Sequence, residues 1–207
     1  MTSLRGLTIK SLCTALCMIC AFAVELVHAS SAITTDQHQH SSTPVTSYQI
    51  DGATFKTSAS TQLKQVGMAE FSYLFWDVYD SYLFNHSGKI DPNYTWYEQA
   101  PLVLEIRYKR DIKADELIDS TIEQWQHLNL KADQYEAYVP WLKKVWPNLK
   151  KGDRLALLVQ DGQSVFFYNQ QELARQPDPY FARIFLDIWL SPDTSEPKLR
   201  KKLLGIK

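Results

Sequence analysis

The sequence has 207 residues, of which 45% are hydrophobic and 22% are charged, and its formal net charge is −1 at pH 7. These values are typical of one globular domain with a sizeable core plus a short additional segment. The near-neutral charge argues against a nucleic-acid-binding protein, because such proteins usually carry a basic surplus or stripe.

Residues 1–29 have the pattern of a secretory signal peptide. Arg5 and Lys10 supply the positive charge, and residues 12–24 form an apolar run that is too short to span a bilayer comfortably. Val27 and Ala29 occupy the −3 and −1 positions of a cleavage site, with Ala32 as the second choice. We therefore expect a periplasmic protein that is cleaved near Ala29 and is not an integral membrane protein after processing. An uncleaved membrane anchor is the alternative.

The segment after the leader, residues 30–47, is rich in Ser, Thr and Gln and reads as a disordered linker. His38 and His40 lie in it, but two histidines on such a segment rarely make a metal site, and we expect no metal. All three cysteines lie in the leader, so the mature chain needs no disulfide. Residues 48–207 are then expected to form one domain.

Strand patterns begin at Tyr48. Residues 48–50 and 53–55 flank an Asp-Gly pair and indicate a tight hairpin. Residues 69–84 are aromatic and almost free of breakers, and they indicate two successive strands or one long bent strand in the centre of the sheet. Residues 102–108 alternate cleanly, with Leu102, Leu104, Ile106 and Tyr108 on one face and Val103, Glu105 and Arg107 on the other.

Helical patterns follow at residues 114–128 and at residues 133–149, where Pro140 predicts a kink or a restart. Residues 154–160 and 163–168 flank a second Asp-Gly pair and give the clearest hairpin signal in the sequence. No internal repeat is visible. This order of elements predicts an α+β fold with a largely antiparallel sheet and helices on one face.

The C-terminal stretch predicts two short helices. In residues 178–190, Asp178 can cap the first turn, Pro179 suits the first helical position, and the helix should stop at Ser191. Its apolar stripe consists of Phe181, Ile184, Phe185, Ile188 and Trp189. We expect Trp189→Ala to be among the most destabilising substitutions. The second helix starts near Ser195 and ends at Gly205.

Motifs for common chemistries are missing from the sequence. There is no phosphate-binding glycine loop, GxSxG or HExxH pattern, or paired-cysteine metal spacing. His86 and His127 could act as general bases, but neither has a partner nearby in the sequence. The many tryptophans lie in periodic segments, and the sequence cannot separate a filled core from a lined ligand pocket.

Three stretches together resemble the bacterial chalcone isomerase-like family of exported proteins: residues 67–84 (GMAEFSYLFWDVYDSYLF), residues 102–125 (LVLEIRYKRDIKADELIDSTIEQW) and residues 185–205 (FLDIWLSPDTSEPKLRKKLLG). The resemblance implies a curved, largely antiparallel sheet with a layer of helices on one face and a cleft between them. Plant enzymes of this superfamily close a chalcone ring without a cofactor, and an arginine steadies the developing negative charge.

The family's catalytic arginine falls at about Phe71, and its threonine on the next strand falls at about Tyr79. Because Phe71 can neither donate a hydrogen bond nor carry charge, efficient isomerisation is not expected. Superfamily members without the arginine include fatty-acid binders. The leading hypothesis is therefore a non-catalytic protein that binds a small apolar ligand at Phe71 and Tyr79, or binds an envelope partner. The alternatives are a cofactor-free isomerase of the intramolecular lyase type that uses Tyr79 and Arg107, and a structural module with a filled core.

Overall fold

The computed structural model describes residues 47–57, 61–91, 93 and 95–206. The predicted signal peptide and most of the predicted linker lie outside these residues. In the described part, eight strands form one sheet in chain order, and each strand is antiparallel to its neighbours. The strands are β1 Tyr48–Asp51, β2 Thr54–Thr57, β3 Gln62–Tyr73, β4 Trp76–Asn85, β5 Leu102–Tyr108, β6 Arg154–Gln160, β7 Gln163–Tyr168 and β8 Gln171–Gln176.

Both hairpins that were predicted from Asp-Gly pairs are present. In the first, Asp51 pairs with Thr54, so the turn residues are Gly52 and Ala53, one position later than expected. In the second, Asp161 and Gly162 have φ values of 52° and 73°. Two positive φ values are what a two-residue type I′ turn requires, so local turn chemistry fixes this hairpin.

Residues 69–84 form the facing halves of a long hairpin, β3 and β4. The chain reverses at Leu74 and Phe75, where Tyr73 pairs with Trp76. The predicted pair of strands is therefore correct, whereas a single bent strand is wrong. β3 begins at Gln62 and continues through Gly67, with an irregular register between Gln65 and Gly67.

The helices are α1 Ala114–His127, α2 Val139–Val145, α3 Pro179–Leu190 and α4 Pro197–Leu203, with short 3₁₀ turns η1 Trp96–Gln99, η2 Ala132–Gln134 and η3 Glu136–Tyr138. Pro140 lies in the first turn of α2, so the helical stretch restarts there, as one of the two predicted outcomes. Strand β8 was not predicted. It is polar and only partly buried, and therefore shows no apolar alternation.

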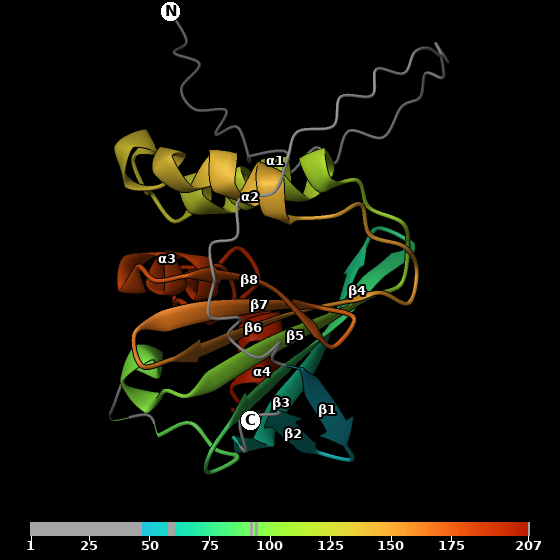
Figure 1. Ribbon diagram of the computed structural model, residues 1–207, viewed down its shortest axis with the longest axis vertical. Coiled ribbons are helices and arrows are strands. Elements are labelled where there is room, and N and C mark those ends of the chain that lie inside the picture. Colours follow the sequence, from blue (N-terminus) through green and yellow to red (C-terminus); the bar gives the residue numbers. More distant parts are fainter. Residues whose placement is uncertain (1–46, 58–60, 92, 94, 207) are drawn as a thin grey trace, which may run out of the picture. The chain divides into compact units, whose positions relative to one another are not determined.

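The helices cover one face of the curled sheet, which we call the outer face (Figure 1). Trp125 of α1 is fully buried there, and its indole N–H donates to the Ile184 carbonyl of α3 at 2.9 Å. On the same face, a β-carbon at Gly67 would collide with the carbonyl oxygens of Lys202 and Leu203. Glycine at this position thus lets α4 lie directly on β3.

Helix α3 begins as predicted, because the Asp178 carboxylate accepts a hydrogen bond from the backbone N–H of Tyr180 at 2.9 Å. Four of the five stripe residues are buried. Trp189, the last of them, is only half-buried and packs against the buried core. The expectation that Trp189→Ala is among the most destabilising changes stays a prediction, and the fully buried Trp125 is the position where truncation should cost more.

The opposite, inner face is enclosed by the curl of the sheet itself. Ser47 pairs with Gln171 at the start of β8, and the Tyr48 N–H donates to the Gln170 carbonyl at 3.0 Å. Tyr48 of β1 also packs edge-on against Phe167 of β7. The buried apolar residues of this face are Tyr48, Phe55, Leu63, Phe84, Val103, Ala156, Leu158, Val165 and Phe167. The observed architecture confirms the predicted α+β fold with a curved antiparallel sheet and helices on one face.

Candidate functional site

Four aromatic residues, which we call the Tyr79 cluster, meet on the outer face: Phe71, Tyr79, Tyr108 and Trp189. Phe71 and Tyr79 are register partners on β3 and β4, and their rings stack with centroids 5.0 Å apart. Tyr108 of β5 packs against Tyr79 at 6.3 Å, edge to face. The Trp189 indole N–H of α3 donates to the Tyr79 hydroxyl oxygen at 3.1 Å. The structure thus brings together the two predicted ligand-binding residues, Phe71 and Tyr79.

The Tyr79 cluster is partly open. Tyr108 is 4% exposed, whereas Phe71, Tyr79 and Trp189 are all partly buried and leave aromatic surface accessible. The Tyr79 hydroxyl oxygen accepts a hydrogen bond from Trp189, and no described residue accepts a hydrogen bond from the Tyr79 O–H. The Tyr108 hydroxyl forms no hydrogen bond with any described residue. The cluster therefore offers an aromatic wall with two hydroxyl donors, the combination that orients an apolar ligand by one polar end.

Electrostatics keep both hydroxyls protonated. Burial raises the pKa of Tyr79 and of Tyr108 well above the ordinary tyrosine value. For Tyr79, the Trp189 hydrogen bond lowers the pKa, and the negative charge of Glu196 raises it again. The charge of Glu196 thus adds to burial in keeping the Tyr79 hydroxyl protonated.

Arg107, the second residue of the isomerase alternative, lies on the other side of the sheet. Side chains alternate along β5, so Tyr108 faces the helices while Arg107 and Glu105 face the inner core. The guanidinium of Arg107 packs 4.2 Å from the Tyr82 ring centroid, and its Nε donates to Glu105 Oε1 at 2.5 Å. The structure therefore does not bring Tyr79 and Arg107 together.

Glu105 is the centre of a buried polar group on the inner face. Its side chain is 0% exposed and accepts from the Tyr48 hydroxyl at 2.6 Å as well as from Arg107. Burial, followed by the charge of Glu105 and the hydrogen bond to it, raises the pKa of Tyr48, so this hydroxyl remains a donor. Burial lowers the pKa of Arg107, but the contact with Glu105 outweighs it and raises the pKa. This group holds the curled sheet together from within.

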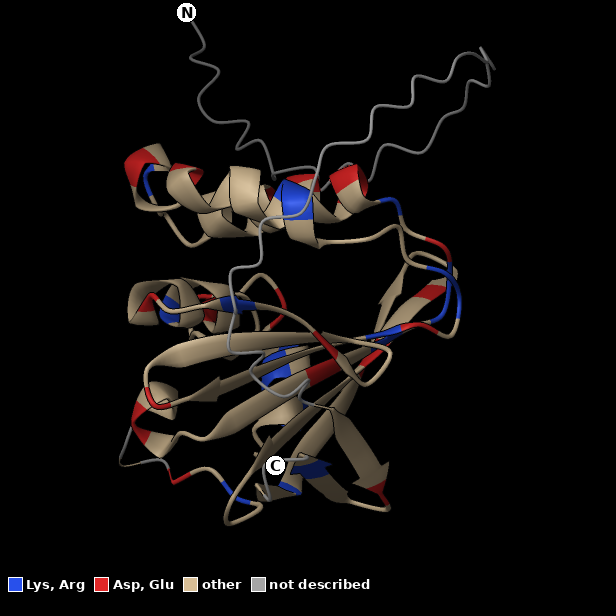
Figure 2. Cartoon of the chain, viewed as in Figure 1, with Lys and Arg blue, Asp and Glu red and all other residues tan. Residues whose placement is uncertain are grey.

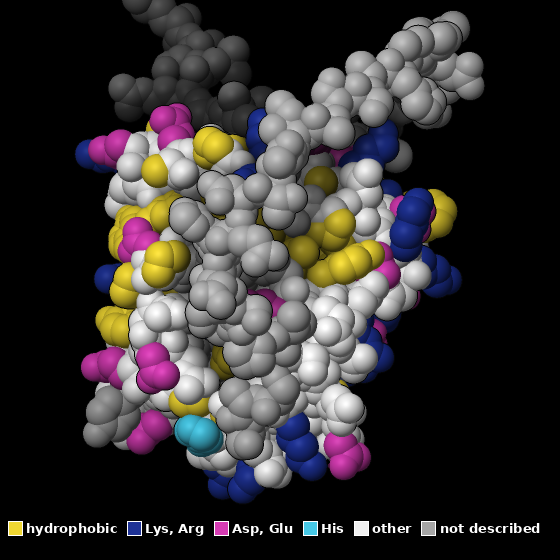
Figure 3. Space-filling model, viewed as in Figure 1, with side chains coloured by type: hydrophobic (Ala, Val, Ile, Leu, Met, Phe, Trp, Pro, Cys, Tyr) yellow, Lys and Arg dark blue, Asp and Glu magenta, His cyan; other side chains and the backbone are white. Residues whose placement is uncertain are grey.

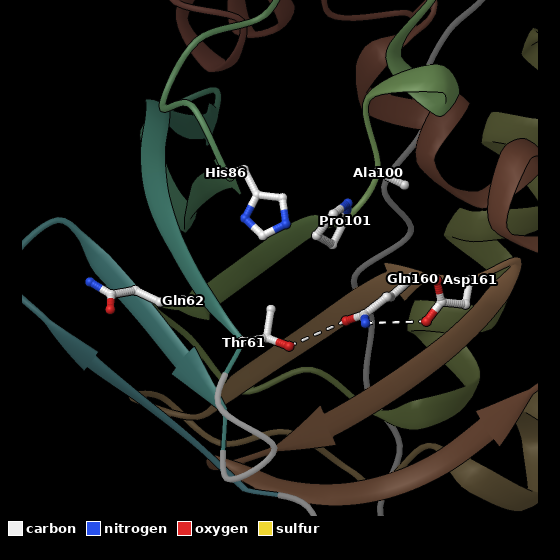
Figure 4. A pocket seen from close by; sticks show the side chains of 7 residues that line it. All are labelled: Thr61, Gln62, His86, Ala100, Pro101, Gln160 and Asp161. Carbon is white, nitrogen blue, oxygen red and sulfur yellow. Dashed lines mark hydrogen bonds between the residues drawn. The ribbon is translucent and has the colours of Figure 1, made fainter.

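A half-open cavity of about 420 Å³ lies at one end of the sheet, between the start of β3, the end of β4 and the β6–β7 turn (Figure 4). Its lining consists of Thr61, Gln62, His86, Ala100, Pro101, Gln160 and Asp161. Hydrogen bonds join the Thr61 hydroxyl to Gln160 at 3.4 Å and the Gln160 amide to Asp161 at 3.2 Å. Among the described residues, this lining is mostly polar and contains no Phe, Tyr or Trp, so it does not suit an apolar ligand.

Sequence reasoning missed two members of the Tyr79 cluster, Tyr108 and Trp189. It placed Tyr108 on the apolar face of its strand and Trp189 on the apolar stripe of its helix, and read both as packing residues. Periodicity gives the face of an element but not its partner, and so could not show that both residues reach Tyr79.

Comparisons with known proteins agree with this architecture. The model of a family described as chalcone isomerase-like matches residues 46–205. An uncharacterised protein of Haemophilus influenzae is 24% identical over 151 residues, which cover 73% of this chain and 72% of that protein. Among solved structures, the Arabidopsis thaliana fatty-acid binding protein AtFAP1 has a similar fold, with a TM-score of 0.54 and 8% identity over 76% of this chain and 95% of that one. Because the family match spans well over half of the sequence, the chain belongs to the chalcone isomerase-like family.

Proposed function

We propose that this protein binds a small apolar ligand, such as a fatty acid, at the Tyr79 cluster and does not convert it chemically. The observation that carries the proposal is the partly open aromatic surface of Phe71, Tyr79 and Trp189, which lies beside two hydroxyl donors. Stacked rings supply apolar contact area, and a few placed donors fix the orientation of a ligand.

The nature of the polar end follows from the groups that the cluster presents. Burial keeps the Tyr79 and Tyr108 hydroxyls neutral, so the cluster suits an uncharged end such as a protonated acid, an alcohol or an ester. The similar fold of AtFAP1, a fatty-acid binding protein, supports a ligand of this general class. Fold likeness by itself does not transfer function, so the proposal depends on the cluster.

Catalysis of the chalcone isomerase type is disfavoured by the residues of the cluster. Phe71 stands at about the position of the family's arginine, and Arg107 is turned to the inner face, where Glu105 pairs with it. The developing negative charge of a ring closure would have to be stabilised by neutral hydroxyls alone. Each missing oxyanion donor costs a factor of about 10²–10³ in rate.

We expect the purified protein not to convert a 2′-hydroxychalcone to the flavanone above the uncatalysed background. The measurement is the loss of chalcone absorbance with and without protein, followed over several hours. Tyr79→Phe is the matched variant, because it removes only the hydroxyl. Conversion by the wild-type protein that disappears in Tyr79→Phe would show that the hydroxyl is catalytic and would overturn the non-enzyme proposal.

We place this function in the periplasm, after cleavage near Ala29. The support is the N-terminal sequence: a positively charged start, a short apolar run and small residues before the cleavage position. In the part of the chain that the structure describes, no helix is long and apolar enough to cross a membrane. The intact mass of the exported protein checks the cleavage site, and a membrane-bound form that retains residues 1–29 would contradict it.

A further inference from the structure

The tip of the β3–β4 hairpin carries three consecutive large apolar residues that face solvent. Leu74 is 76% exposed, Phe75 is 97% exposed and Trp76 is 68% exposed. Single exposed apolar residues are common on protein surfaces, but a contiguous exposed group marks an interaction site. We call these three residues the apolar tip.

The apolar tip projects beyond the rest of the sheet. Pairing between β4 and β5 begins only at Tyr79, so residues 72–78 of the hairpin extend past the neighbouring strand. The residue at the apex is also unusual, because Leu74 has a φ of 55°. This left-handed conformation is strained for a residue with a side chain, and glycine is the usual choice at the first position of such a turn. A leucine here strains the backbone and adds an apolar side chain to the surface.

The size of the apolar tip argues against a protein partner as its occupant. A large aromatic side chain buries about 150–250 Å². Two aromatic side chains and one leucine thus bury less than the roughly 800 Å² per partner of a stable protein interface. The headgroup region of a bilayer needs no such area, because it takes up projecting Trp, Phe and Leu side chains one at a time.

Basic residues lie beside the hairpin. The backbone N–H of Lys109 donates to the Val78 carbonyl at 2.9 Å, which places the β5–α1 loop next to the start of β4. Lys109 pairs with Asp80 at 2.7 Å, and Lys150 pairs with Asp111 at 2.9 Å. Figure 2 shows Lys and Arg on these loops with acidic residues between them, and Figure 3 shows hydrophobic side chains next to dark blue ones at the same edge.

Two further cations lie nearby, Arg110 on the β5–α1 loop and Lys151 on the α2–β6 loop. Both are exposed and form no ion pair with any described residue. They are the groups that could meet lipid phosphates when the apolar tip enters a membrane surface. Acidic residues pair with Lys109 and Lys150. We therefore expect insertion of the apolar tip to contribute more to membrane affinity than charge does.

We propose that the apolar tip inserts into the headgroup region of a lipid bilayer and holds the protein at a membrane surface. The tip lies directly beyond the Tyr79 cluster on the same hairpin, since Phe71 and Tyr79 are separated from the turn by only two residue pairs, Ser72–Asp77 and Tyr73–Trp76. A membrane-bound protein would therefore hold the proposed ligand site close to the bilayer. Membrane binding does not depend on the ligand, however, and stands as a separate inference.

The test is co-sedimentation of the purified protein with vesicles of phosphatidylcholine alone and of phosphatidylcholine with one-fifth phosphatidylglycerol. Phe75→Asp should weaken binding to both by about tenfold or more, because an exposed aromatic anchor is replaced by a charge. Ile206→Asp is the matched control: Ile206 is 49% exposed, follows Gly205, which lies against Val66 in the first half of β3, and acquires the same charge. Its binding should equal that of the wild type.

A second variant, Leu74→Gly, separates membrane binding from folding. Glycine relieves the left-handed strain, so this variant should be as stable as the wild type or more stable, yet bind vesicles less tightly. The inference is overturned if the wild type does not sediment with vesicles or if Phe75→Asp and Ile206→Asp bind equally well. It is also overturned if light scattering shows a dimer that Phe75→Asp converts to a monomer, because the tip would then be a contact between copies of this chain.

Discussion

Replacing Arg107 with alanine is expected to lower the free energy of unfolding by about 3 kcal/mol, the low end of the range for breaking a buried ion pair. Glu105 is 0% exposed and would be left with the Tyr48 hydroxyl as its remaining hydrogen-bond donor. The Arg107 side chain is 31% exposed, so water can partly reach Glu105 once the guanidinium is gone. Urea denaturation of the variant and the wild type measures the difference.

The matched second change is Glu105→Gln in the Arg107→Ala background. Glutamine removes the buried charge but keeps a carbonyl oxygen that can accept from Tyr48. We therefore expect the double variant to regain a large share of the lost stability. If Arg107→Ala is destabilising but Glu105→Gln restores nothing, then the loss comes from packing of the arginine stem against Tyr82, and the buried-charge explanation is wrong.

Replacing Trp125 with alanine is expected to cost about 3–5 kcal/mol, the range for truncating a fully buried tryptophan. The side chain fills the space between α1 and α3, packs against Tyr135 with ring centroids 5.2 Å apart, and donates to the Ile184 carbonyl. Truncation would leave a cavity and remove the hydrogen bond from the indole to the Ile184 carbonyl. For a domain of this size each kcal/mol lowers the melting temperature by about 2–4 °C.

Trp76→Ala is the control for this prediction, because it makes the same chemical change at a position that is 68% exposed. Its effect should stay within about 0.5 kcal/mol. A melting temperature of Trp125→Ala close to that of the wild type would show that α1 does not depend on the Trp125 contact with α3. An equal loss of stability in the two variants would contradict the finding that Trp125 is buried and Trp76 is exposed.

Most of the fold could be predicted because the elements that form it carry strong local signals. The β6–β7 hairpin has a turn dipeptide between two apolar runs, and helix α3 has both a capping aspartate and a wide apolar stripe. Strand β8 lacks such a signal, since its residues are polar and only partly buried at the edge of the sheet. The curl that closes the inner face is likewise a property of the whole sheet, which no local pattern can predict.

The candidate site could be predicted only in part. Alternation along β5 places Arg107 and Tyr108 on opposite faces, which was visible in the sequence. Which face belongs to the Tyr79 cluster depends on how β4 pairs with β5, and that register appears only in three dimensions. The resemblance that aligned Phe71 and Tyr79 with family positions supplied what periodicity could not, whereas Trp189 became part of the site only through the packing of α3.

The most direct test of ligand binding is a titration followed through the tryptophan indole N–H signals by nuclear magnetic resonance. The sequence has six tryptophans, and Trp189→Phe assigns the signal of interest. Delipidated protein would be titrated with dodecan-1-ol and, separately, with dodecanoic acid. The Trp189 indole should shift and saturate with the alcohol, more strongly than with the ionised acid, because its N–H bonds to Tyr79 inside the cluster. The Trp125 indole, which bonds to Ile184 in the core, should not move. A Trp189 signal that stays in place with both compounds, or a saturable shift confined to other tryptophans, would contradict the account.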